Sequence, residues 1–172
     1  SAEELAERRD DLEIKVRGKG CPPPVDTWVQ CGLSDRVLAL LEKFGLGEPF
    51  PIQAQALPAI MSGRDVIGVA KTGSGKTLAY LLPLFRHALD QPALGEGGGP
   101  IALVMAPARE LAVQIYREAL KFAKPLGMSV TAVYGGAGVA EQIGALKRGA
   151  DIVVATPGRM IDLLTMQQGR MI

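Results

Sequence analysis

The segment Ala70-Lys71-Thr72-Gly73-Ser74-Gly75-Lys76-Thr77 decides the fold of this chain. It follows an apolar run, Val66–Ala70, with the pattern of a buried strand, and it precedes a helical pattern that reaches about Leu89. A glycine-rich turn in this context, ending in Lys-Thr, is typical of a phosphate-binding loop, or P-loop. An ordinary glycine-rich turn is the alternative. A chance match in 172 residues has odds on the order of one in a hundred, so we expect a nucleotide site here.

The residue types of this loop suit a triphosphate. Gly73 and Gly75 allow backbone conformations that point successive N–H groups into one hollow, and a helix starting near Lys76 adds its positive N-terminal end. Lys76 can reach the β- and γ-phosphates and the Thr77 hydroxyl can ligate Mg²⁺, so these two are the candidate catalytic residues. The chain contains no Asn, hence no guanine-specifying Asn-Lys-x-Asp motif, which favours ATP. The predicted phosphate-binding residues are Thr72, Gly73, Ser74, Gly75, Lys76 and Thr77.

Downstream of the loop, apolar runs alternate with helical patterns. Strands are predicted at Ile101–Met105, Met128–Tyr134 and Ile152–Ala155, and helices at 109–123, 139–147 and from about 157. With Val66–Ala70, this pattern predicts an α/β fold with a four-stranded parallel sheet and helices on both faces. Right-handed crossovers place the carboxyl ends of all strands at one edge, where such sheets bind ligands.

The N-terminal third has a different pattern. Residues 1–11 have helical spacing, Leu12–Val16 alternates like a short strand, and Gly18–Pro24 has the composition of a linker. Helices are predicted at 35–44, capped by Ser34, and from Pro51 to Met61. We therefore expect a charged extension with a Pro-rich linker at 1–25 and the folded domain at 26–172.

Composition excludes several classes of protein. The formal net charge of +1 leaves no global basic excess, so nucleic acid would have to bind a local patch. No apolar run is long enough to cross a membrane, and the charged N-terminus is unlike a signal peptide, so an intracellular protein is expected. Cys21 and Cys31 fit free, reduced thiols, and the isolated His87 does not indicate a metal site.

Three predicted strand ends carry basic residues or exposed backbone amides. The segments are Pro107-Ala108-Arg109, Tyr134-Gly135-Gly136 and Thr156-Pro157-Gly158-Arg159. Such groups suit contacts with a nucleic-acid backbone, which position a strand without reading its sequence. Taken singly, Arg109 and Arg159 fit helix caps or ion pairs equally well.

These motifs, in this order and spacing, resemble the DEAD-box RNA helicases over about residues 26–172. The resemblance implies the P-loop NTPase, RecA-like version of the α/β fold, with ATP and Mg²⁺ as cofactors. It also implies RNA, as a single strand or short duplex, held through its backbone. The RNA-binding residues implied are Pro107, Arg109, Gly135, Gly136, Thr156, Gly158 and Arg159.

The segment Gly45–Gln53 is similar to the Q motif of that family, and Trp28 stands at the position of its isolated upstream aromatic residue. The resemblance implies that Gln53 reads the adenine edge and that residues around Leu46 pack against the base. Two positions depart from the family. Phe50 and Ala108 replace residues that usually carry a hydroxyl, and each lost hydrogen bond is worth about 0.5–1.5 kcal/mol.

The closest resemblance is to the DEAD-box helicases that act with the branch-site snRNP in early spliceosome assembly. It implies a nuclear pre-mRNA-splicing ATPase whose partners are splicing ribonucleoprotein components. The sequence contains no Asp-Glu-Ala-Asp or Ser-Ala-Thr segment, and it starts without Met, so a fragment with an incomplete sheet and a marginal fold is expected. We expect it to bind ATP without hydrolysing it appreciably.

Two other readings remain open from the sequence. The chain could be a non-catalytic truncated isoform that binds protein partners, or a P-loop ATPase that acts on DNA.

Overall fold

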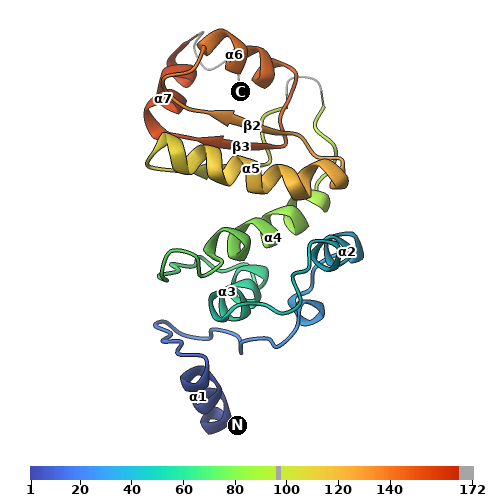
Figure 1. The fold of residues 1–172 in the computed structure, drawn as a ribbon, viewed down its shortest axis with the longest axis vertical. Coiled ribbons are helices and arrows are strands. Elements are labelled where there is room, and N and C mark those ends of the chain that lie inside the picture. The colour runs from blue at the N-terminus through green and yellow to red at the C-terminus, as the bar shows by residue number, and fades with distance from the viewer. Residues whose placement is uncertain (96–97, 167–172) are drawn as a thin grey trace. The chain divides into compact units, whose positions relative to one another are not determined.

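The computed structural model describes residues 1–95 and 98–166 (Figure 1). Its contacts divide the chain into two compact units, Ser1–Arg86 and His87–Ile172. The expected division into residues 1–25 and 26–172 stays a prediction, but residues 1–25 belong to the first unit here. In the described part of the chain, no helix combines the length and apolar character needed to span a membrane.

The first unit is built from helices. They are α1 (Ala2–Asp11), the 3₁₀ helix η1 (Trp28–Cys31), α2 (Asp35–Lys43), α3 (Pro51–Met61) and the start of α4 (Lys76–Leu89). Local signals place several of the ends, because Ser1 caps α1 through a capping box with Glu4 and Pro51 is the first residue of α3. The most deeply buried side chains of this unit are Val37, Leu41, Leu57, Leu81, Leu82 and Phe85.

The strand predicted at Val66–Ala70 is wrong. No residue between Arg64 and Lys71 is assigned to a strand, and the segment runs as extended chain up to the P-loop. Ile67 is 95% exposed and Val69 is 89% exposed. A strand exists only through hydrogen bonds to a neighbour, and none of the described residues supplies one.

The short strand predicted at Leu12–Val16 is also wrong. The Leu12 N–H donates to the Arg8 carbonyl and the Ile14 N–H donates to the Arg9 carbonyl, with Glu13 at φ 54°. These bonds close the C-terminal end of α1 with a left-handed residue, so the alternating residues form a helix end.

The second unit contains a parallel sheet of three strands. Strand β3 (Ile152–Ala155) lies in the centre, between β1 (Ala102–Met105) and β2 (Val130–Val133). Helix α5 (Arg109–Leu126) connects β1 to β2, and α6 (Val139–Lys147) connects β2 to β3. Helix α7 (Pro157–Thr165) follows β3, so the α/β class and the parallel arrangement are confirmed, with three strands in place of four.

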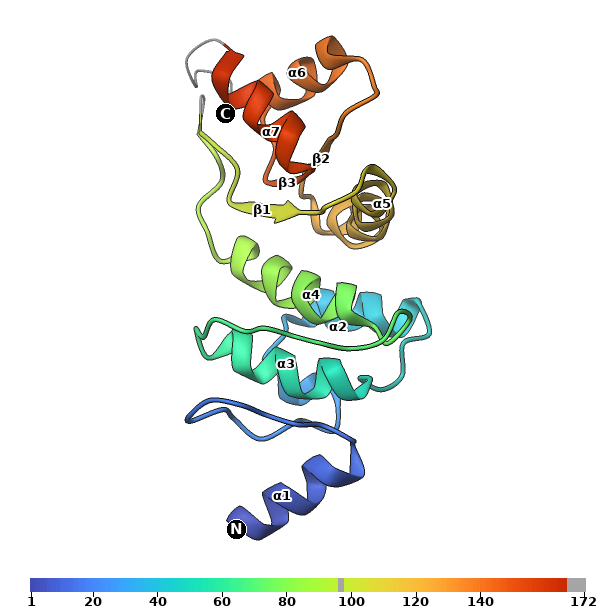
Figure 2. The same ribbon diagram turned by 90° about the vertical axis from the view of Figure 1, so that its left-hand side faces the viewer.

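Helices cover both faces of this sheet. In Figures 1 and 2, α5 lies on one side of the strands, while α6 and α7 lie on the other. On the face covered by α6 and α7, strands and helices form a buried hydrophobic cluster of Val133, Leu146, Ala150, Val153, Ala155, Met160 and Leu163. Because the three strands are parallel and in register, the turns that follow Met105, Val133 and Ala155 all lie at one edge.

Candidate functional site

The P-loop keeps the curled backbone that its sequence predicts. Gly73 and Gly75 have φ of 80° and 85°, in the left-handed region that favours glycine, and α4 begins at Lys76. A Cβ atom built on Gly75 would clash with the Gln53 amide and would lie 2.8 Å from Phe50 Cδ2. A side chain at position 75 would therefore displace the Gln53 and Phe50 side chains at the start of α3, in addition to adopting an unfavourable positive φ.

Some of the loop's donors already have partners within the protein. The Lys76 ammonium donates to the carbonyls of Ala70 and Lys71, the latter at 2.6 Å. The Ser74 hydroxyl and N–H also donate to the Lys71 carbonyl, at 2.7 and 3.4 Å. In this arrangement the ammonium is therefore hydrogen-bonded to carbonyls at the start of the loop.

The remaining donors suit an anion. Within the described ranges, the N–H groups of Gly73, Gly75 and Lys76 have no protein acceptor. They lie beside the N-terminal end of α4, where unpaired amides and the helix dipole favour negative charge. A triphosphate fits this donor set once Lys76 exchanges two carbonyl oxygens for phosphate oxygens.

Gln53 connects the Q-motif segment to the P-loop. Its Oε1 accepts from the Phe50 N–H at 2.8 Å, and its Nε2 donates to the Gly75 carbonyl at 3.0 Å. The side chain is 2% exposed, so its polar atoms are satisfied inside the protein. The predicted contact of Gln53 with adenine stays a prediction. Each polar atom of the amide keeps one unused donor or acceptor position, but the buried side chain would have to become accessible to the base.

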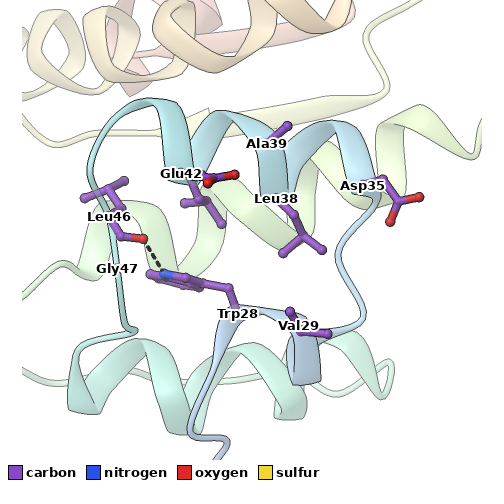
Figure 3. A pocket seen from close by; sticks show the side chains of 9 residues that line it. Trp28, Val29, Asp35, Leu38, Ala39, Glu42, Leu46 and Gly47 are labelled. Carbon is purple, nitrogen blue, oxygen red and sulfur yellow. Dashed lines mark hydrogen bonds between the residues drawn. The ribbon is translucent and has the colours of Figure 1, made fainter.

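Trp28 is hydrogen-bonded to the Q-motif segment. Its indole is buried, and Nε1 donates to the Leu46 carbonyl at 2.8 Å (Figure 3). The ring lies at the base of an open pocket of about 450 Å³ between η1 and α2. Leu46 also lines this pocket, next to the acidic side chain of Glu42. Trp28 thus holds the backbone at Leu46, whereas Leu46 itself remains partly accessible.

Thr77 lies in the first turn of α4, one turn before Tyr80. Burial raises the pKa of Tyr80, and a hydrogen bond with the Thr77 side chain opposes that rise. Among the residues that the structure describes, no group of three or more His, Cys, Asp or Glu could hold a metal ion. Thr77 alone does not form a metal site, so Mg²⁺ would have to be bound together with the phosphates.

The three turns of the second unit form a connected edge. The Arg109 guanidinium lies over the Tyr134 ring, with 5.6 Å between Cζ and the ring centroid. A Cβ atom on Gly136, which has φ 80°, would lie 2.6 Å from Arg109 Nη1. Arg109 therefore packs on the turn after β2 while remaining exposed to solvent, and a side chain at position 136 would displace its guanidinium from this place.

The Arg159 guanidinium, which is predicted to contact RNA, is hydrogen-bonded within the protein. Its Nη1 donates to Gln142 Oε1 at 3.1 Å and to the Ala137 carbonyl at 3.3 Å. Gln142 is buried, and its Nε2 donates to the Tyr134 carbonyl at 3.0 Å. Arg159 and Gln142 together join the start of α7 to the turn after β2.

The other predicted residues of this edge differ in accessibility. Pro107, Gly135 and Gly158 are exposed, whereas Thr156 is partly buried. The Thr156 N–H donates to the Val133 carbonyl at 2.9 Å, which extends the pairing of β2 with β3 by one bond. The sequence did not identify Gln142 as a supporting residue, because a single Gln in a helix carries no recognisable signal.

Comparisons with known proteins agree with this arrangement. The family described as DEAD/DEAH box helicase matches residues 50–172. The chain is 61% identical over 171 residues to the probable ATP-dependent RNA helicase DDX46 of Danio rerio, covering 99% of this chain and 17% of that protein. It is 58% identical to the pre-mRNA-processing ATP-dependent RNA helicase PRP5 of Gibberella zeae, covering 97% of this chain and 14% of that protein. The chain thus spans about a sixth of the length of these relatives.

Solved structures show the same fold. The crystal structure of the RNA helicase Prp28 from Chaetomium thermophilum bound to ADP superposes with a TM-score of 0.89 at 42% identity, covering 98% of this chain and 41% of that one. The yeast DEAD-box splicing factor Prp28 superposes with a TM-score of 0.88 at 32% identity, covering 97% and 41%. By its sequence motifs, its parallel sheet and these matches, the chain belongs to the DEAD/DEAH box helicase family.

Proposed function

We propose that this chain is the ATP-binding part of an ATP-dependent RNA helicase that acts in pre-mRNA splicing. The observation that carries the proposal is the P-loop, where Gly73 and Gly75 curl free amides around the start of α4. The relative named as a pre-mRNA-processing RNA helicase, the yeast splicing factor Prp28 and the ADP-bound Prp28 structure support it. Nuclear location and splicing ribonucleoprotein partners are part of the same proposal.

Different residues would bind different parts of the nucleotide. Lys76 and the amides of Gly73 and Gly75 would hold the phosphates, and Thr77 would share a Mg²⁺ ion with them. Gln53 would face the adenine, since its amide presents a donor, Nε2, and an acceptor, Oε1, side by side on one carbon. Bound Mg-ATP supplies the phosphoryl group whose transfer to water drives the helicase cycle.

RNA would bind along the turns after β1, β2 and β3. Arg109 offers a charged donor to phosphates, and the exposed Gly135 and Gly158 allow close approach of the strand. Because Arg159 is hydrogen-bonded to Gln142 and Ala137, we expect it mainly to hold this edge in shape. Such contacts address the backbone, so they predict binding with little sequence preference.

The test is a titration of the chain with a fluorescent ATP analogue. Lys76→Ala should weaken binding by about 10- to 100-fold, the range for losing a charge-assisted hydrogen bond. Lys43→Ala, which removes an exposed lysine from the end of α2, is the matched control and should bind like the unmodified chain. Equal binding by the Lys76→Ala and unmodified chains would remove the nucleotide proposal.

A further inference from the structure

The chain between α1 and η1 is bound along α3. We call residues 12–25, which follow α1, the N-terminal strap; Figures 1 and 2 show this segment running beside α3. At the far end of α3, Arg64 Nη1 donates to the Lys19 carbonyl at 3.2 Å. The composition of Gly18–Pro24 predicts a linker, yet the strap is hydrogen-bonded to α3 and to the turn that follows α3.

One bond compensates for a proline inside α3. The Ala54 carbonyl would normally accept from the N–H of residue 58, but Pro58 has no N–H. The Val25 N–H donates to this carbonyl at 3.0 Å instead. The strap therefore supplies the donor that α3 lacks, immediately after Gln53.

A second set of bonds involves the neighbouring residue, Gln55. This side chain is 6% exposed, and both its polar atoms bind the strap or α1. Its Nε2 donates to the Pro22 carbonyl at 2.9 Å, and its Oε1 accepts from Arg9 Nε at 2.9 Å. Arg9 Nη2 also donates to the carbonyls of Cys21 and Pro22, at 3.3 and 3.2 Å, so one guanidinium fixes the strap and Gln55 together.

Gln53 and Gln55 face opposite sides of the same helix turn, because two residues correspond to about 200° of rotation. Gln53 binds the P-loop at Gly75, while Gln55 binds the strap at Pro22. Any rotation of α3 that loosens the strap also moves the Gln53 amide. The geometry points to Arg9 and Gln55 as positioning residues that set Gln53 for recognition of the base, an inference that rests on the proposed function.

The two parts of a nucleotide would respond differently to a loss of the strap contacts. The P-loop would hold the phosphates, which ATP and GTP have in common, whereas the part of the nucleotide that Gln53 would contact is the base. Arg9→Ala and Gln55→Ala should therefore weaken ATP binding by about tenfold while leaving GTP binding nearly unchanged. A general loss of folding would weaken both nucleotides equally.

The experiment measures the Kd of ATP and of GTP by displacement of a fluorescent ATP analogue from the 172-residue chain. Arg9→Ala is the primary variant, because Arg9 is only partly buried and its removal leaves the core intact. Arg9→Lys keeps the charge without the planar fork and should behave like Arg9→Ala. Arg17→Ala is the matched control; it removes an exposed strap arginine that has no hydrogen-bond partner in the described part of the chain.

The outcomes separate this inference from the proposed function. A reduced ATP-to-GTP preference in Arg9→Ala and Gln55→Ala, but not in Arg17→Ala, supports the strap as a positioning element. An unchanged preference in Arg9→Ala, or equal weakening of both nucleotides, overturns it while the nucleotide site stands. If the unmodified chain itself shows no preference for ATP, the base-binding part of the proposed function fails and the inference falls with it.

Discussion

At the scale of single residues, Ala108 marks a position where the chain lacks a useful side chain. It is the N-cap of α5, with φ −129° and ψ 150°, and it makes no side-chain hydrogen bond. Threonine in this backbone conformation can accept from an N–H of the first helical turn. We therefore expect Ala108→Thr to raise the free energy of unfolding by about 1 kcal/mol.

Denaturant unfolding measures this gain, and Ala108→Val is the matched control because Val has the shape of Thr without the hydroxyl. Ala108 also lies on the edge proposed for RNA, between Pro107 and Arg109. The hydroxyl should therefore strengthen binding of a single-stranded RNA as well. Equal stability of the Thr and Val variants would show that the cap is not formed.

The two thiols should differ in reactivity. Cys31 is buried, and desolvation raises its pKa from 9.0 to about 11, whereas Cys21 is partly exposed. With this pKa, only about one Cys31 in a thousand is ionised at pH 8. The thiolate is the reactive form of a cysteine, so Cys31 should react slowly. A thiol reagent should label Cys21 first, and labelling of Cys31 should keep accelerating as the pH rises toward 11.

Mass spectrometry of the labelled chain assigns the modified residue. Labelling in denaturant is the control, since both thiols should then react at similar rates. Equal labelling of both thiols at pH 8 without denaturant would contradict the burial of Cys31.

Individual residues were predictable where the backbone conformation demands one residue type. Gly73 and Gly75 have the positive φ that the P-loop sequence implies. Gln55 and Gln142 were not predictable. Each is buried by contacts with segments more than a helix turn away, and a glutamine in a helix has the same local pattern whether it is buried or exposed.

At the scale of elements, the helices and the three paired strands follow their sequence patterns closely. Residue 43 ends α2 one position before the predicted end, and α5 continues three residues beyond the predicted 123. Val66–Ala70 shows the limit of such patterns. An apolar run predicts that a segment can be buried in a sheet, but whether it pairs depends on a neighbouring strand that local sequence does not reveal.

The unpaired segment is expected to cause self-association. Ile67 and Val69 are almost fully exposed, and their own backbone groups have no partner among the described residues, so they can pair with a second copy. Ile67→Lys should therefore reduce association at high protein concentration, because a charged side chain opposes pairing of such edges. Light scattering over a concentration series measures this effect.

Val29→Lys is the control for this prediction. Val29 is 74% exposed, but it lies in the short helix η1, whose backbone is not extended. Its replacement should leave association unchanged. If both variants, or neither, reduced association, the extended segment would not be its cause.

At the scale of the whole molecule, binding ATP and hydrolysing it are separable. The P-loop offers Lys76, Thr77 and free amides for the phosphates, but hydrolysis also needs a carboxylate that orients water and a charged group that stabilises the transition state. The sequence contains no Asp-Glu-Ala-Asp segment, and no acidic side chain is hydrogen-bonded to the described P-loop. An arginine finger alone is worth roughly 10³–10⁵ in rate.

We therefore expect the 172-residue chain to bind ATP while releasing phosphate at a negligible rate, with or without RNA. A longer chain of the same protein that includes the acidic segment is the positive control, and its rate should rise on addition of RNA. The Lys76→Ala version of the longer chain should lose that activity, which separates it from a contaminating ATPase. Turnover near one per second, a rate typical of working ATPases, by the 172-residue chain would show that its own residues complete the catalytic site.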